Sequence, residues 1–176
     1  SLPPSEQVAA IRAALESFRE ETGVSRVIVV HLASSEAQRE APDSWTTLST
    51  FEAAVEAGEA QPASVLYAYA ALQAGCAFVN FTPSAGASIA ALGGLATSAG
   101  IPIAGGDGKT GETLVKTVLA PMFRARALKV LAWQGYNMIG NRDGEVLEEQ
   151  AHKAAKLRNK GQVLRGLLED DELHTQ

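Results

Sequence analysis

Residues 26–32 read Arg-Val-Ile-Val-Val-His-Leu, and this stretch indicates the fold class. An apolar run without polar alternation is typical of a strand that is buried on both faces of a parallel sheet. Parallel strands must be joined by long crossovers, which are usually helices, so we expect an α/β fold. His31 lies inside the run and is interpreted as a core histidine with satisfied hydrogen bonds.

Strands and helices alternate at short spacing along the rest of the chain. Apolar runs predict three further strands, at 77–81, 101–104 and 128–133. Helical patterns, several of them closed by a glycine, fall at 5–23, 50–58, 64–74, 88–98, 112–126 and 145–160. This alternation predicts a doubly wound, Rossmann-like parallel sheet of about four strands, with helices on both faces.

Composition narrows the class of protein. The 176 residues are 46% hydrophobic and 20% charged, as in a globular domain, and the net charge of −5 argues against a nucleic-acid partner. The single cysteine, Cys76, excludes a disulfide framework and is interpreted as a packing residue. No run approaches the roughly 20 apolar residues of a membrane span, and residues 1–4 do not resemble a signal peptide, so we expect a cytoplasmic protein without a membrane partner.

Ligands of such sheets bind at the carboxyl ends of the strands, which makes 32–36, 80–86, 105–111 and 134–144 the candidate loops. The strongest is Gly105-Gly106-Asp107-Gly108-Lys109-Thr110-Gly111, because it opens a helix whose N-terminus favours an anion. It matches G-x-G-x-x-G, but the next strand ends at Trp133-Gln134 without the acidic residue of that fingerprint. A P-loop would place its first glycine at Ile103. A glycine-rich structural turn with a solvated lysine is the alternative.

A second polar cluster follows the last predicted strand. Asn137, Asn141, Arg142 and Asp143 lie between glycines in this loop. Lysines 153, 156 and 160 then share one face of the predicted helix, where a phosphate would suit three ammonium groups. A solvated basic face is the alternative. Residues 81–86 also offer hydroxyl groups, which could serve as turn residues alone.

Taken together, these segments resemble the inositol-3-phosphate synthase (myo-inositol-1-phosphate synthase) family. Residues 26–36 are similar to its strand ending in Trp-Thr-Ala-Asn-Thr-Glu, and 64–72 with 78–80 to its helix leading to Asn-Gly-Ser-Pro. Residues 106–113 resemble its Gly-Asp-Asp-x-Lys-Ser-Gly-Gln-Thr loop, 137–144 its Asn-x-x-Gly-Asn-Asn-Asp-Gly motif, and 156–160 its Lys-x-x-x-Lys pair. The chain departs from the family at Glu112 for glutamine, Arg142 for asparagine, His31-Leu32 for Trp-Thr and Phe81 for glycine.

The resemblance implies an isomerase of inositol and phospholipid biosynthesis that uses NAD to cyclise the sugar phosphate glucose 6-phosphate. The implied steps are oxidation at C5, enolisation, closure of the C1–C6 bond and reduction. The implied cofactor-binding residues are Ser34, Ser35, Asp107, Lys109, Thr110 and Gly111. The implied catalytic and substrate-binding residues are Asn141, Asp143, Lys156 and Lys160.

The family's first glycine-rich strand–loop–helix is expected before residue 1, and its tetramer-forming portion after residue 176. We therefore interpret residues 1–144 as a Rossmann-like portion and 145–176 as the truncated start of a catalytic and oligomerisation portion. The expected protein is a fragment or a divergent short relative, a homo-oligomer, and inactive on its own. The alternative is a non-catalytic nucleotide- or phosphate-binding module that uses only loop 105–111.

Overall fold

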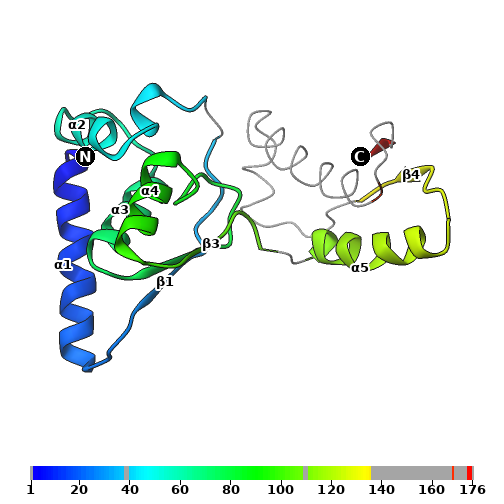
Figure 1. The fold of residues 1–176 in the computed structure, drawn as a ribbon, viewed down its shortest axis with the longest axis horizontal. Helices are drawn as coiled ribbons and strands as arrows, with labels where there is room; N and C mark the ends of the chain where they lie inside the picture. Colours follow the sequence, from blue (N-terminus) through cyan, green and yellow to red (C-terminus); the bar gives the residue numbers. More distant parts are fainter. Residues whose placement is uncertain (1, 38–39, 109–110, 136–167, 169–173, 176) are drawn as a thin grey trace. The chain divides into compact units, whose positions relative to one another are not determined.

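The computed structural model describes residues 2–37, 40–108, 111–135, 168 and 174–175 (Figure 1). The chain divides into two compact units, Ser1–Asp107 and Gly108–Gln176. The predicted division after residue 144 falls outside the described residues and stays a prediction.

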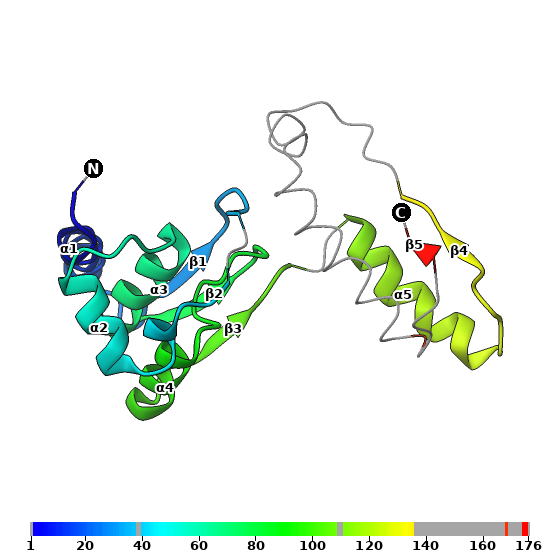
Figure 2. The same ribbon diagram turned by 90° about the horizontal axis from the view of Figure 1, so that it is seen from above.

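The first unit contains a three-stranded parallel sheet. Its strands are β1 (Ile28–His31), β2 (Ala77–Asn80) and β3 (Ile103–Gly105), in the order β1-β2-β3 (Figure 2). Its helices are α1 (Pro4–Thr22), the 3₁₀ turn η1 (Asp43–Trp45), α2 (Leu48–Glu56), α3 (Ala63–Gln73) and α4 (Ala90–Ala99). This alternation of parallel strands and helices confirms the predicted Rossmann-like α/β class.

Local chemistry explains where the helices begin and end. Helix α1 starts at Pro4, directly before the predicted range 5–23, with a proline at its first position and no side-chain cap, so Ser5 lies inside the helix. It ends at Gly23, whose φ of 66° is the left-handed C-cap that the sequence predicted. Helix α2 begins earlier than predicted, because Thr47 and Thr50 form a reciprocal capping box.

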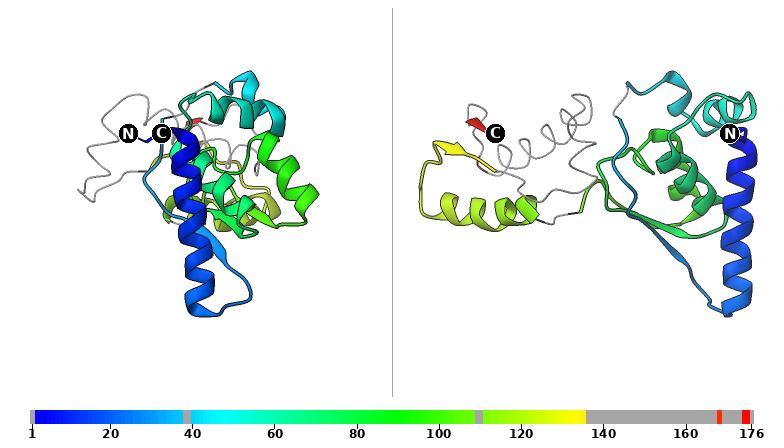
Figure 3. Two further views of the ribbon diagram at one scale, coloured as in Figure 1. Left: turned by 90° about the vertical axis from the view of Figure 1, so that its left-hand side faces the viewer. Right: turned by 180° about the vertical axis from the view of Figure 1, so that it is seen from behind.

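Helix α3 is the centre of the first unit's core. It is buried around most of its circumference, and it lies between α1 and the sheet (Figure 2). Helix α1 is the outer helix of this unit, on the side of α3 away from the sheet (Figure 3). The fully buried side chains Phe51, Phe78, Leu92 and Val65 come from α2, β2, α4 and α3, so every layer contributes to one core.

The expectation that residues 26–32 are buried on both faces is wrong. His31 is 8% exposed, whereas Ile28 is 62% and Val30 47% exposed. The strands lie across the sheet in the same order as in the sequence. Right-handed crossovers therefore place the connecting helices on one face of these three strands. That face carries His31, Phe78 and Asn80, and the described helices leave Ile28 and Val30 uncovered.

The second unit contains α5 (Gly111–Ala125) and β4 (Ala132–Trp133), which pairs in parallel with β5 (His174–Thr175). The predicted fourth strand is therefore shorter than 128–133 and belongs to a separate two-stranded sheet. Its pairing partner is a two-residue strand near the chain's end, which no apolar run could reveal. Among the described residues, no helix combines the length and hydropathy that a membrane span requires.

Candidate functional site

The carboxyl ends of the three parallel strands meet at one edge of the sheet. The register pairs His31 with Asn80 and Asn80 with Gly105, which are the last residues of β1, β2 and β3. The loops that follow these strands therefore start side by side, as predicted for 32–36, 80–86 and 105–111. Ligands of open α/β sheets bind at such an edge.

Asn80 is the polar centre of this edge. It is 3% exposed, and its side chain makes three local hydrogen bonds. Nδ2 donates to the carbonyl of Ser84 at 2.8 Å, and Oδ1 accepts from the amide and the hydroxyl of Thr82 at 2.9 and 2.8 Å. The Asn80 carbonyl accepts from the amide of Gly106 at 3.1 Å. One residue thus holds both the loop after β2 and the loop after β3.

Two glycines allow these loops to close on Asn80. A Cβ at Gly105 would collide with the Asn80 carbonyl oxygen, and a Cβ at Gly86 would lie 2.7 Å from Asn80 Nδ2. Both glycines have positive φ, 102° and 50°. No side chain larger than hydrogen can therefore occupy either position without moving Asn80.

Asp107 adopts a strained backbone conformation directly after this contact. Its φ is 106°, a region that non-glycine residues rarely occupy, and its side chain is half-buried. Strain of this kind costs about 1–3 kcal/mol and gathers at functional sites. The neighbouring Gly106 is open, because a Cβ there would meet no atom within 4 Å. The loop combines a backbone that a ligand can approach closely with a carboxylate that can accept a hydrogen bond.

Glu36 anchors the loop after β1. Its carboxylate accepts from the amide of Ser64 at 3.0 Å and from the Ser64 hydroxyl, in the first turn of α3. Its own amide donates to the Ser84 hydroxyl at 3.0 Å. The Ser64 hydroxyl also accepts from the amide of Gly86 at 3.2 Å. Three segments that are distant in the sequence are joined here.

The predicted cofactor-binding residues fall in these loops where the structure describes them. Ser34 is exposed and Ser35 half-buried, between the end of β1 and Glu36. Gly111, with a φ of 51°, begins α5 in the second unit. Lys109 and Thr110 lie outside the described residues, as do all four predicted catalytic residues: Asn141, Asp143, Lys156 and Lys160.

His31 is a core residue, but its hydrogen bonds are not all satisfied as expected. Its ring stacks on Phe78 with centroids 6.1 Å apart, and the Tyr67 ring lies 6.4 Å away. Its buried Nε2 atom has no hydrogen-bond partner among the described residues. The aromatic neighbours explain this, because neither Phe78 nor the tilted Tyr67 ring offers Nε2 a polar atom.

In the second unit, sequence reasoning missed Lys116. This side chain is 2% exposed, its Nζ lies 2.9 Å from Glu112 Oε1, and it stands 5.7 Å from the centre of the Trp133 ring. Glu112 also approaches Gly135, where a Cβ would lie 2.5 Å from Oε1. The pair therefore ties the start of α5 to the end of β4. The spacing of four residues between Glu112 and Lys116 was the available signal.

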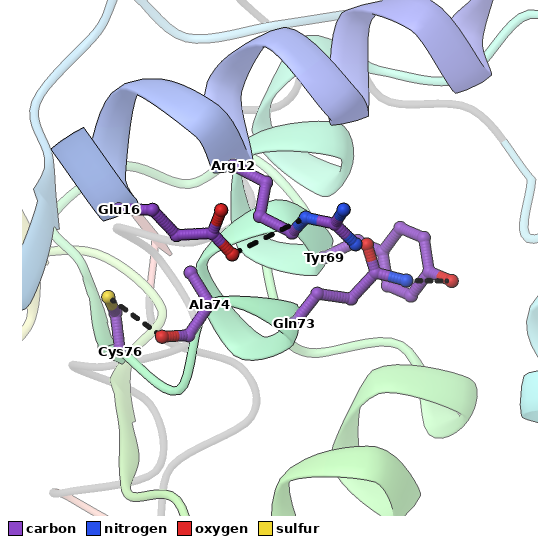
Figure 4. Close-up of polar contacts among 6 residues, drawn as sticks. All are labelled: Arg12, Glu16, Tyr69, Gln73, Ala74 and Cys76. Carbon is purple, nitrogen blue, oxygen red and sulfur yellow. Dashed lines mark hydrogen bonds and ion pairs between the residues drawn. The ribbon is translucent and has the colours of Figure 1, made fainter.

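A cavity of about 390 Å³ lies between α1, α2 and α3, on the C-terminal half of α3. The Tyr69 hydroxyl donates to Glu52 at 2.8 Å. It accepts from the side-chain amide of Gln73 at 2.7 Å (Figure 4). Burial, and then the bond to Glu52, raise the pKa of Tyr69 above the ordinary tyrosine value. Burial also raises the pKa of the Cys76 thiol, which is fully buried as a packing residue should be. The cavity is separate from the carboxyl edge, because its α3 residues lie at the opposite end of that helix from Ser64.

Comparisons with known proteins agree with this fold. A model of the NAD-binding family described as myo-inositol-1-phosphate synthase matches residues 3–164, and its NAD-binding description confirms NAD as the predicted cofactor. The chain is 34% identical over 168 residues to inositol-3-phosphate synthase 1 of Bacteroides thetaiotaomicron, covering 94% of this chain and 39% of that protein. It is 31% identical over 168 residues to the human enzyme, covering 95% of this chain and 30% of that protein.

Solved structures give the same result. An inositol-3-phosphate synthase from Caenorhabditis elegans shares the fold with a TM-score of 0.87 at 22% identity, over 98% of this chain and 36% of that one. A myo-inositol-1-phosphate synthase-related protein from Thermotoga maritima has a TM-score of 0.71 at 26% identity, over 94% of this chain and 44% of that one. The chain spans 30–39% of the length of the curated relatives given above. Because the family model matches nearly the whole chain, the protein belongs to the myo-inositol-1-phosphate synthase family.

Proposed function

We propose that this chain is the part of an inositol-3-phosphate synthase that binds NAD and begins the sugar-phosphate site. The observation that carries the proposal is the joining of three loops at the carboxyl edge, with the strained Asp107 beside them: Asn80 holds the loops after β2 and β3, and the Glu36 amide bonds the loop after β1 to Ser84. A scaffold that holds a strained carboxylate next to open backbone is suited to orienting a ligand. The family match supports the choice of NAD as that ligand.

In this proposal the cofactor-binding residues are Ser34, Ser35, Asp107, Lys109, Thr110 and Gly111. NAD, when bound, supplies the oxidation at C5 and the later reduction. The hydroxyl and carboxylate groups orient it, and the glycines allow the backbone to approach it closely.

The substrate-binding and catalytic groups in the proposal are Asn141, Asp143, Lys156 and Lys160. The two lysines bind the phosphate and the oxygens on which negative charge develops during enolisation and ring closure. One preorganised donor of this kind contributes about 3 kcal/mol to the transition state. Either lysine can also transfer the proton of the enolisation step.

The proposal extends to the whole protein. It would be a homo-oligomeric, cytoplasmic isomerase that converts glucose 6-phosphate into myo-inositol 3-phosphate for phospholipid biosynthesis, with further segments needed for turnover. A non-catalytic module built on loop 105–111 is less favoured, because the family match continues through residue 164, past that loop and over the asparagine and lysine motifs.

Titration of NAD into the wild-type chain and into Asp107→Asn tests the cofactor site. Asparagine keeps the shape of aspartate and tolerates positive φ, so the fold should survive. We expect about tenfold weaker NAD binding, the equivalent of one charge-assisted hydrogen bond. Asp43→Asn, at an exposed residue of η1, is the control that should not change NAD binding. Unchanged binding in Asp107→Asn would contradict the assignment.

Lysine variants separate the synthase from the module. In the synthase, Lys156→Ala weakens glucose 6-phosphate binding at least as much as Lys109→Ala does. In the module, Lys109→Ala alone abolishes ligand binding. If neither substitution changes phosphate binding, both functions are wrong.

A further inference from the structure

The carboxylate of Glu36 is held by hydrogen bonds alone. No ion pair to it occurs among the described residues, and both of its oxygens accept bonds from Ser64 at the start of α3. A carboxylate at this place is stabilised by the helix dipole and by two otherwise unpaired donors. Glu36 therefore caps the N-terminus of α3, although it precedes Ala63, the first residue of that helix, by 27 residues in the sequence.

The backbone amide of Glu36 connects the loop after β1 to the loop after β2. Its amide donates to the Ser84 hydroxyl, and the Ser84 amide donates to the Thr82 hydroxyl at 3.2 Å. Thr82 is bonded to Asn80, so the chain of bonds runs from the loop after β1 to the end of β2. Ser64 adds a second connection through the amide of Gly86. Glu36 is consequently bound to α3 and to the loop after β2 at once.

Ser34 and Ser35 lie between two fixed points. Before them, the His31 carbonyl accepts from the Phe81 amide at 3.0 Å; after them, Glu36 is anchored as described. Their own hydroxyl groups make no hydrogen bond within the described part of the chain. The position of these two serines therefore depends on His31 and Glu36, and their hydroxyls stay available to a ligand.

We propose that Glu36 is a positioning residue that holds Ser34 and Ser35 in place at the carboxyl edge for NAD. This inference rests on the proposed function of that edge. It assigns to Glu36 an indirect role: it touches neither the cofactor nor the substrate, and it acts through the two serines. A glutamine at position 36 can accept one bond from Ser64 but cannot offer two acceptor oxygens to two donors.

Calorimetric titration of NAD into Glu36→Gln and Ser64→Ala tests the inference. Ser64→Ala removes the hydroxyl, and with it the bonds to Glu36 and to the Gly86 amide, but keeps the amide that binds Glu36. It is the second variant that keeps the test valid if Glu36→Gln does not fold. We expect Glu36→Gln to weaken NAD binding about tenfold, the equivalent of one charge-assisted hydrogen bond. Ser64→Ala should also weaken NAD binding.

Two controls separate positioning from general stability. Glu21→Gln changes an exposed glutamate that also accepts from a serine, Ser17, but on α1; its NAD affinity should be unchanged. Phe51→Leu weakens the core and lowers the melting temperature, yet should leave the NAD affinity of the folded protein unchanged. An equal loss of affinity in Phe51→Leu and Glu36→Gln would overturn the inference, because the effect would then follow stability.

Amide hydrogen exchange over residues 33–37, without NAD, distinguishes this inference from the proposed function. If Glu36 holds the loop, exchange there is faster in Glu36→Gln than in the wild type, whether or not the wild type binds NAD. A wild type that fails to bind NAD would refute the proposed function alone. Unchanged exchange, or unchanged NAD affinity in a variant of a binding wild type, would refute the positioning role of Glu36.

Discussion

The buried ion pair between Glu112 and Lys116 leads to a prediction about stability. The ammonium of Lys116 is 2% exposed, whereas the side chain of Glu112 is 24% exposed. Removing the carboxylate with Glu112→Gln therefore leaves a charge that water cannot reach. Breaking a buried pair in this way costs 3–5 kcal/mol, and the glutamine carbonyl can still accept one bond, so we expect a loss of about 3 kcal/mol.

Removing the charge of the other partner, Lys116, should lower the free energy of unfolding by less. Lys116→Met leaves a carboxylate that is partly hydrated and lies in the first turn of α5, where the helix dipole stabilises it. Methionine also fills the space beside Trp133, so the expected loss is about 1 kcal/mol. The double variant should lie within about 1 kcal/mol of the wild type, because no unpaired charge remains buried.

Urea unfolding is followed by the fluorescence of Trp133 in a Trp45→Phe background. It gives the free energies of unfolding of the parent protein, the two single variants and the double variant. The refuting result is two small, equal and additive losses of less than about 0.5 kcal/mol, as for an exposed ion pair.

Three further predictions concern the first unit. Gly105→Ala should lower the free energy of unfolding by about 2–4 kcal/mol in urea titrations, because its Cβ collides with Asn80 and φ is positive, whereas Gly93→Ala in α4 should be neutral or stabilising. The pKa of Tyr69 is higher in the folded than in the unfolded state, so its contribution to the free energy of unfolding is full below about pH 10 and falls as the pH rises further. Tyr69→Phe should remove this pH dependence from alkaline unfolding curves. Cys76, fully buried with a raised thiol pKa, should react with a thiol reagent at pH 8 only as fast as the protein opens, and fast labelling of the folded protein would contradict its burial.

The fold class followed from sequence because its signals are local. The run at 26–32, the glycines after helices and the alternation of elements depend on neighbouring residues, and the structure confirms them. Which face of β1 is covered depends instead on the direction in which the strand order advances, and no strand's own sequence contains that information. The exposed Ile28 and Val30 were therefore unpredictable from residues 26–32.

The same distinction applies to the site. The sequence placed four loops, 32–36, 80–86, 105–111 and 134–144, at the carboxyl ends of strands of one parallel sheet. The register confirms this for the first three, whereas β4, the strand before 134–144, pairs in a separate two-stranded sheet. The bond of Glu36 to Ser64, 28 residues away, is a tertiary contact. Its sequence separation matches no spacing of a local motif, so the sequence does not predict it. The roles of Ser34, Ser35 and Asp107 in binding NAD stay predictions.

The measurement that tests the central claim most directly is calorimetric titration of the purified 176-residue chain with NAD and then with glucose 6-phosphate, with an inositol phosphate assay on the same sample. The account predicts that NAD and the sugar phosphate bind and that no inositol phosphate forms. Absence of binding by both ligands would contradict the proposed site, and turnover would contradict the proposal that further segments are required.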